Sequence, residues 1–246
     1  MRKHVYGPIN SRRLGKSLGV DLIVPKICPL DCIYCEARAT TELTMERREY
    51  VSIDEVLAEI DQVLSEIPMP DYITFSGAGE PTLNSGIGRV IEYLKKNYPQ
   101  SKVCLLTNGL LLNDKTLQQE LALLDTIIPS LDASNEAEYL KINRPVPGET
   151  LEKLVEGIAD FHRNYPKIFM ALEMFIAPGI NDSDDSLKRF TELVKKISPD
   201  ALQLNTLARP GVIADLTPAD PQTMKKFAEV LNKTVPVTFI SGVAKN

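Results

Sequence analysis

The sequence lacks any apolar run close to the 18 residues that a membrane-spanning helix requires, and it carries no excess of positive charge. Its formal net charge of −5 gives no overall basic footprint for nucleic acid, although local basic patches remain possible. The first residues, MRKHVYGPINSRR, contain no apolar segment of the kind found in secretory signal peptides. These absences predict a cytoplasmic protein with reduced thiols and no membrane partner.

Cysteine is also scarce, but three of the four cysteines, Cys28, Cys32 and Cys35, share the segment KICPLDCIYCEA. In a reducing compartment such a cluster favours a metal site over a disulfide. No fourth thiol lies nearby, whereas structural zinc and an ordinary iron–sulfur cubane each need four protein ligands. His4 could complete a zinc site, but it lies 24 residues before Cys28, which is not a usual zinc spacing. The segment therefore predicts a metal centre that is one protein ligand short.

Strand and helix patterns alternate along the chain, with no linker or internal repeat between them. In the first helix, Ser52 and Glu55 form a capping box, and Val51 can pack on Val56. Strands are expected at 17–24, 71–81, 102–109, 126–134, 167–182 and 200–211, with a short one at 236–240. Helices are expected at 52–64, 87–98, 114–123, 150–164, 183–197 and 221–232.

Six strand–helix units of roughly 30 residues predict an α/β fold with a parallel sheet. Eight units would close a TIM barrel of about 250 residues, so six predict an incomplete (β/α)6 TIM-type barrel that is open on one side. A flat, doubly wound sheet is the alternative. In both folds the functional residues lie at the carboxyl ends of the strands. The cysteine segment, GAGEP, TNG, SLDA, GIND and NTLARP all follow strands, so they are expected on one face.

The C-x3-C-x2-C spacing, with Tyr34 directly before the last cysteine, resembles the signature of the radical S-adenosylmethionine (SAM) superfamily. The resemblance implies that Cys28, Cys32 and Cys35 bind three irons of one [4Fe–4S] cluster, while the amino and carboxylate groups of SAM bind the fourth. It also implies that the reduced cluster passes an electron to SAM. The products are methionine and a 5′-deoxyadenosyl radical that abstracts hydrogen from a substrate.

A second motif supports the resemblance. SGAGEPTL is similar to the family's Gly-Gly-Glu-Pro motif, with Ala78 in place of the first glycine. By this resemblance the Gly79 backbone and Glu80 hold the methionyl amine, and Tyr34 packs beside the adenine. A carboxylate beside an ammonium is sensible chemistry. The alternative for the motif alone is a glycine-rich turn with an exposed Glu80.

Further candidates follow the later strands. Thr107 and Asn108 are expected near SAM, although Asn108-Gly109 could be a simple turn. Relatives use the region of Ser130 and Asp132 for the ribose or carboxylate of SAM, and the alternative for Asp132 is a helix N-cap. Asn205 is expected to face substrate or SAM.

Two arginines precede prolines, Arg144-Pro145 and Arg209-Pro210, in segments that follow strands. Proline disfavours the helical region for the residue before it, so both arginines are expected in extended backbone. A guanidinium held in this way can bind an anionic group of the substrate. Alternatively, each arginine pairs with an acidic side chain and braces its loop, or holds the SAM carboxylate. The sequence assigns no role to Arg12 and Arg13.

The resemblance covers nearly all of 1–246 as one radical SAM core domain, with an N-terminal extension at 1–16 and a helical tail at 212–246. It is strongest to uncharacterised Fe–S oxidoreductases that are often placed with wybutosine-synthesis enzymes. It implies anaerobic chemistry with a flavodoxin or ferredoxin as reductant. No cysteine follows Cys104, which is expected to be a buried thiol, so no auxiliary cluster is expected.

The sequence leaves the substrate open and identifies no catalytic acid, base or radical relay. A small molecule could enter the open side of the barrel, or the chain could activate a partner protein as glycyl-radical activases do. A tRNA base is the third possibility, and the negative net charge disfavours it. An iron–sulfur electron carrier is the non-enzymatic alternative, but it would normally have four cysteine ligands.

Overall fold

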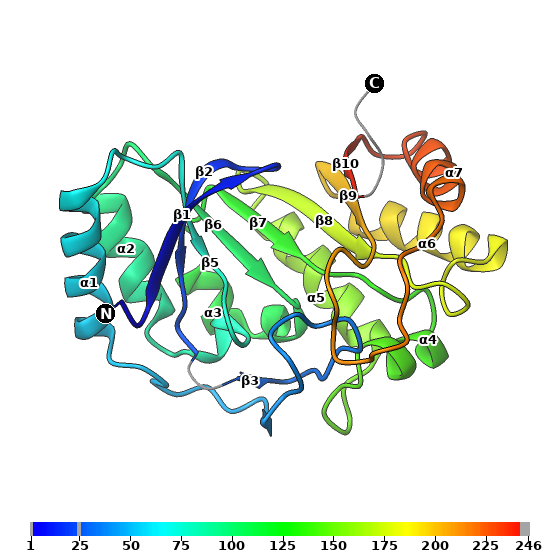
Figure 1. The fold of residues 1–246 in the computed structure, drawn as a ribbon, viewed down its shortest axis with the longest axis horizontal. Coiled ribbons are helices and arrows are strands. Elements are labelled where there is room, and N and C mark those ends of the chain that lie inside the picture. The colour runs from blue at the N-terminus through cyan, green and yellow to red at the C-terminus, as the bar shows by residue number, and fades with distance from the viewer. Residues whose placement is uncertain (1, 24–25, 242–246) are drawn as a thin grey trace.

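The computed structural model describes residues 2–23 and 26–241 of the chain, which form an α/β fold built around one curled sheet (Figure 1). Its eight strands follow the order β1-β2-β5-β6-β7-β8-β9-β10. All neighbouring pairs run parallel except β1 and β2. The predicted incomplete parallel barrel, open on one side, is confirmed. The strands are β1 (Val5–Ser11), β2 (Gly15–Val20), β5 (Tyr72–Phe75), β6 (Lys102–Thr107), β7 (Thr126–Pro129), β8 (Phe169–Phe175), β9 (Ala201–Asn205) and β10 (Val237–Ile240).

Helices lie outside the curled sheet, and the six predicted ones all form. Ser52 caps the first of them as predicted, since its side chain accepts a hydrogen bond from Glu55 N, and Thr150 and Ser183 cap two later helices in the same way. α4 (Glu136–Ile142) was not predicted, because its seven residues are too few to show a helical period. The others are α1 (Ile53–Glu66), α2 (Ile87–Asn97), α3 (Lys115–Glu120), α5 (Leu151–Asn164), α6 (Asp184–Ile197) and α7 (Pro221–Leu231).

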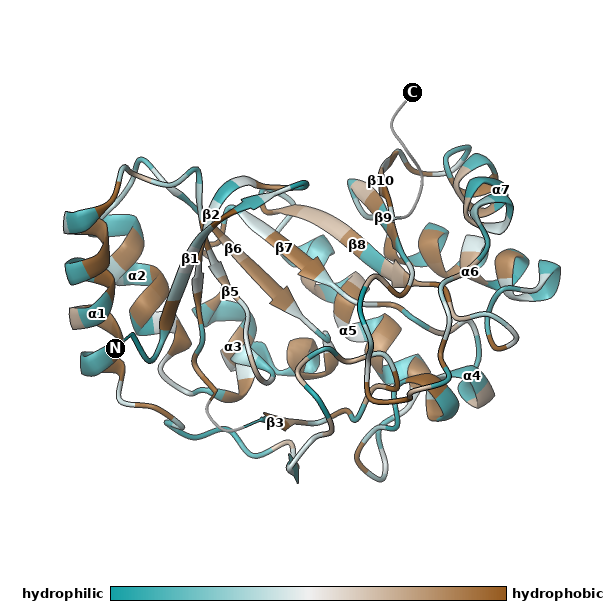
Figure 2. Cartoon of the chain, in the orientation of Figure 1, coloured by the Kyte–Doolittle hydropathy of each residue, from teal (hydrophilic) through white to brown (hydrophobic). Residues whose placement is uncertain are grey.

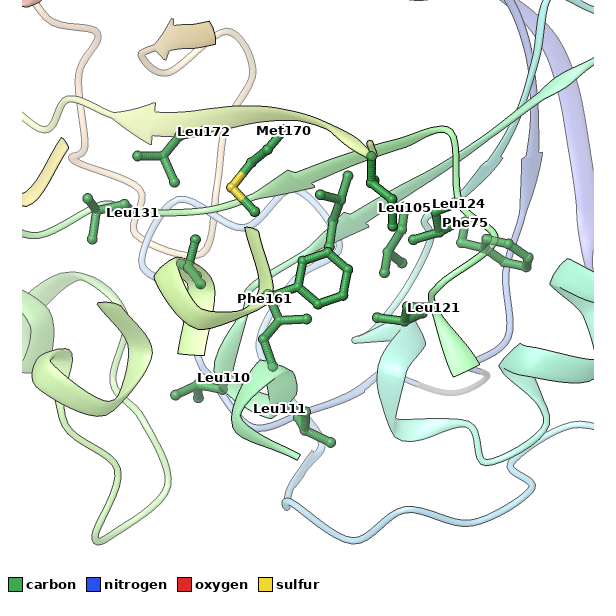
Figure 3. Close-up of a cluster of buried hydrophobic side chains, with 14 of the residues drawn as sticks. Phe75, Leu105, Leu110, Leu111, Leu121, Leu124, Leu131, Phe161, Met170 and Leu172 are labelled. Carbon is green, nitrogen blue, oxygen red and sulfur yellow. The ribbon is translucent and has the colours of Figure 1, made fainter. Parts of the chain in front are cut away.

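The main core lies between these helices and the outer face of the sheet (Figures 2 and 3). Figure 3 shows Phe161 of α5 among Leu105 of β6 and Met170 of β8, all of them fully buried. Alternate strand residues point to the opposite, inner face. There Cys104 is buried as predicted, and burial raises the pKa of its thiol to about 12.

The two edge strands of the sheet come from segments that were predicted as the extension and the tail of the core domain: β1 from the N-terminal extension and β10 from the C-terminal tail. β1 was not predicted, because Gly7 and Pro8 interrupt its pattern and most of its side chains are at least half-exposed. It pairs with β2, so residues 5–11 belong to the sheet. β10 pairs with β9 at the other end, after α7. Residues 242–246 of the predicted tail, and Val24 of the first predicted strand, lie outside the described residues.

The strands end earlier than predicted, and their carboxyl ends point toward the segment with the cysteines. The arrowheads of β6 and β7 in Figure 1 face the loop that contains β3 (Ile27–Cys28). β3 pairs in parallel with β4 (Glu42–Leu43) in a small separate sheet. Short 3₁₀ turns, η1 (Pro81–Leu83) and η2 (Leu110–Asn113), follow β5 and β6. None of the helices in the described residues has the length and apolarity of a membrane span.

Candidate active site

The cysteine loop, residues 26–36, is held against the carboxyl end of the half-barrel by backbone hydrogen bonds. Asp31 N donates to Asn143 O at 3.0 Å, and Ile33 N donates to Ile142 O at 2.9 Å. From the other side, Ile213 N donates to Ile33 O at 3.1 Å. The segments after α4 and β9 therefore fix the loop between them, and Figure 1 shows the chain after β9 descending to it.

Each of the three cysteine sulfurs of this loop accepts a hydrogen bond from one N–H donor. Burial raises the pKa of the Cys28 thiol to about 12, so without metal this thiol is protonated, and metal binding would release its proton. Thiolates suit a soft metal centre, and hydrogen bonds to sulfur tune iron–sulfur potentials. The pairs are Asn108 Nδ2 with Cys28 Sγ at 3.5 Å, Asn143 Nδ2 with Cys32 Sγ at 3.5 Å, and Lys26 Nζ with Cys35 Sγ at 3.0 Å.

Within the described ranges, no three His, Cys, Asp or Glu side chains gather around a point that could hold one ion. A [4Fe–4S] cluster does not need such an arrangement, because each thiolate binds a different iron. The donor set of three thiols on one loop fits that cluster. His4, the candidate zinc ligand, lies beside Glu55 of α1, with 3.9 Å between Nε2 and Oε2. The ligand roles of the cysteines stay a prediction.

Glu80 is buried, with 3% of its surface exposed, and the turn that contains it is docked on the cysteine loop. Its Oε1 accepts hydrogen bonds from the hydroxyls of Thr82 and Thr107, both at 2.7 Å, and its Oε2 accepts one from Asn108 N at 2.8 Å. Burial raises the pKa of the carboxyl above its ordinary value. The alternative of an exposed Glu80 on a simple turn is therefore wrong, because the carboxylate joins β5 to β6.

Gly79 is required by the same docking. A Cβ on Gly79 would collide with the carbonyl of Ile27, to which Glu80 N donates a hydrogen bond at 3.1 Å. The backbone of the Gly-rich turn therefore lies directly against the strand that leads into Cys28. This contact brings the two motifs, which lie far apart in the sequence, into one site.

Asp132 is also buried and connects three parts of the site. It accepts hydrogen bonds from Tyr34 Oη at 2.6 Å, Asn143 Nδ2 at 2.8 Å and Phe175 N at 3.0 Å. The Tyr34 ring stacks on Phe175, with 4.0 Å between centroids. The N-cap alternative for Asp132 is wrong, because Asn135 caps α4. Asp132 therefore fixes the tyrosine that lies between Cys32 and Cys35, and burial raises the pKa of its carboxyl.

The two Arg-Pro arginines each pair with an acidic residue of the cysteine loop. Arg144 lies 3.7 Å from Asp31, and Arg209 lies 3.0 Å from Glu36. The prediction of extended backbone is wrong for Arg144, whose φ is +46°. There the preference before proline yields to docking, since the Arg144 carbonyl accepts a hydrogen bond from Asp31 N at 3.2 Å. Both contacts favour the loop-bracing alternative.

A cavity of about 510 Å³ occupies the interior of the half-barrel. Tyr34 and Cys35 line it on the side of the cysteine loop, and Asn205 and Arg209 line its wall. Arg144 is not among the residues that line it. Ser130 lies at the end of β7, where its N–H donates to Thr107 O at 3.0 Å. The predicted residues thus come together at one end of the barrel, and the cavity extends from there toward the other end.

The profile of the Radical SAM superfamily matches residues 22–191, which contain the cysteine loop, the Glu80 turn and Asp132. The chain belongs to the radical SAM superfamily. It is 38% identical over 207 residues to a protein named GTPase Obg from Brachyspira hyodysenteriae, a match that covers 84% of this chain but only 30% of that protein. It is 30% identical to the UPF0026 protein MJ1312 of Methanocaldococcus jannaschii, over 94% of this chain and 71% of the other.

Among solved structures, this radical SAM chain is similar to TYW1 with a lysine–pyruvate adduct bound. The TM-score is 0.63 at 18% identity, over 89% of this chain and 74% of that one. This likeness concerns the fold alone. It agrees with the curled half-barrel described above.

Sequence reasoning missed three residues of this radical SAM site: Lys26 and Asn143, which donate to cysteine sulfurs, and Glu173, which pairs with Arg13. Lys26 is the first residue of the cysteine segment, and Asn143 directly precedes the Arg144-Pro145 pair. Their positions were therefore visible, but their contacts with sulfur were not. The pair between Glu173 and Arg13 had no local signal, because 160 residues separate its members.

Proposed function

We propose that this radical SAM enzyme cleaves SAM reductively at one [4Fe–4S] cluster held by Cys28, Cys32 and Cys35. The observation that carries the proposal is the arrangement of the three thiols. They share one loop at the carboxyl end of the half-barrel, each with an N–H donor to its sulfur, and the buried Glu80 turn lies against that loop. The bound cluster and SAM would supply a 5′-deoxyadenosyl radical for hydrogen abstraction, with electrons from a flavodoxin or ferredoxin.

The chain's own residues would position these groups. The Gly79 carbonyl and the Glu80 carboxylate would accept hydrogen bonds from the SAM ammonium, because both belong to the turn that contacts the cysteine strand. Thr107 and Asn108, which bind Glu80, hold that carboxylate in place. Asp132 fixes Tyr34 for contact with the adenine, and Ser130 lies on the neighbouring turn. The cavity beside Cys35 would hold the substrate.

The proposal is tested by anaerobic reconstitution with iron and sulfide, followed by reduction with dithionite in the presence of SAM. The wild type should contain about four irons per chain and form 5′-deoxyadenosine. Replacing Cys28, Cys32 or Cys35 with alanine should abolish both, because each removes one of only three protein ligands. Cys104→Ala is the matched control, since Cys104 is buried away from this loop, and its iron content should be unchanged. A Cys32→Ala variant that retains four irons would contradict the assignment.

A further inference from the structure

The turn between β1 and β2 places two adjacent arginines, the exposed Arg12 and the half-buried Arg13, at the mouth of the half-barrel opposite the cysteine loop. Figure 1 shows the tip of this hairpin reaching across the sheet toward β9 and β10. Arg12 and Arg13 both line the cavity that contains Cys35 at its other end. The turn is anchored by Leu14, which packs on a cluster of small and apolar inward side chains: Cys104, Ile128, Ala171 and Ala201.

Arg13 is held rigidly by two neighbouring strands. Its Nη1 forms an ion pair with Glu173 of β8 and donates to Gln203 Oε1 of β9 at 2.8 Å. Only 22% of its side chain is exposed, and burial together with Arg12 lowers the pKa of its guanidinium. Both bonds use Nη1, and no bond in the described residues uses its Nη2 or Nε. A guanidinium fixed in this way is preorganised for a planar oxyanion.

Arg12 adds a second positive charge at the same place. Its guanidinium carbon lies 5.1 Å from the centre of the Phe239 ring, and that of Arg13 lies 5.9 Å from the same ring. Among the described residues, no carboxylate pairs with Arg12. The cavity is lined by three arginines, the third being Arg209, and by two glutamates, Glu36 and Glu173, which leaves one positive charge uncompensated. This excess occurs in a chain whose formal net charge is −5.

We propose that Arg12 and Arg13 form a subsite for a carboxylate or phosphate group of a small-molecule substrate. The proposal rests on the proposed function, because it places the reacting part of that substrate toward Cys35. Two adjacent guanidinium groups repel each other, and an oxyanion between them removes the repulsion while accepting charge-assisted hydrogen bonds. The cavity volume of about 510 Å³ lies within the range of small-molecule sites.

Titration calorimetry with inorganic phosphate and with succinate tests the subsite at low ionic strength. The wild type should bind at least one of them saturably, and the stronger ligand identifies the oxyanion. Arg12→Gln should raise the Kd of that oxyanion about tenfold or more. Arg12→Lys should raise it less, because lysine keeps the positive charge but lacks the paired N–H donors of a guanidinium. Arg89→Gln is the matched control, since Arg89 pairs with Asp54 outside the cavity, and its Kd should equal that of the wild type.

Arg13→Gln leaves Glu173 without its cation, so its melting temperature is measured alongside its Kd. If Arg13→Gln does not fold, the Arg12→Gln variant still tests the proposal, because Arg12 is exposed and its replacement should leave the fold intact. The proposal is overturned if neither oxyanion binds the wild type, or if Arg12→Gln binds as tightly as Arg89→Gln. Formation of 5′-deoxyadenosine by the wild type is measured separately. If the wild type binds an oxyanion but forms no 5′-deoxyadenosine, the proposed function is refuted and the subsite is kept. If it forms 5′-deoxyadenosine but binds no oxyanion, the subsite is refuted and the proposed function is kept.

Discussion

Asp132→Ala should destabilise the protein strongly, because the buried carboxylate accepts three hydrogen bonds. Tyr34 Oη and Phe175 N would lose their acceptor, and Asn143 Nδ2 would keep only the sulfur of Cys32. A buried donor left without a partner costs about 1–3 kcal/mol, so two of them, with the weakened pairing of Asn143, cost about 3–6 kcal/mol. Removing a carboxylate whose pKa is raised by burial recovers part of this cost. We therefore expect a net loss of about 3–5 kcal/mol in the free energy of unfolding.

Urea unfolding of the metal-free protein under nitrogen measures this loss directly. Asp61→Ala is the matched control, because Asp61 also accepts hydrogen bonds from two tyrosine hydroxyls, Tyr93 and Tyr98, both at 2.6 Å. Asp61 is only half-buried, so water can replace its carboxylate, and the expected loss is below about 1.5 kcal/mol. Equal losses in the two variants would refute the argument that burial of the Asp132 network sets its cost.

The remaining predictions concern cofactor affinity, pH and the loop contacts. Glu80→Ala should weaken SAM binding to the reconstituted enzyme by about 1–3 kcal/mol in anaerobic calorimetry, and an unchanged Kd would remove Glu80 from the SAM site. Burial raises the pKa of Asp132, so the stability that its protonated form provides at low pH is lost as pH rises through the raised value. The unfolding free energy of wild type minus that of Asp132→Asn should therefore fall as pH rises above about 4, the ordinary pKa of an aspartate, and a rise would contradict the sign of the shift. A double-mutant cycle on Arg209 and Glu36, both well exposed, should give a coupling below about 1 kcal/mol that vanishes in high salt, whereas a larger salt-resistant coupling would show a rigid clamp.

Much of the fold could be predicted from local patterns. The six inner strands end in glycine or polar turns, and several helices carry an apolar stripe and a cap such as Ser52 or Thr150, so short-range sequence determines them. The edge strand β1 could not be predicted in this way. Its pairing depends on a partner, β2, that also pairs on its other side, while most of its own residues are exposed and show no buried period.

The site shows the same division. The spacing of Cys28, Cys32 and Cys35 is local, so the sequence indicated one metal centre, and the chain's family agrees with it. The bond from Tyr34 to Asp132 spans 98 residues, and nothing near either residue specifies it. Long-range docking also overrode a local rule at Arg144, where a backbone bond to Asp31 outweighs the preference imposed by proline.

The contact between the β1–β2 turn and strands β8 and β9 affects how the chain is made. During translation, Arg13 is added to the chain 160 residues before its partner Glu173. At typical synthesis rates that interval is roughly 8–30 seconds. Throughout it, the hairpin tip has no complete pair of strands β8 and β9 on which to dock. The segment that is made first can therefore take its final place only after β9 has formed, so closure of the barrel interior is a late event in biogenesis.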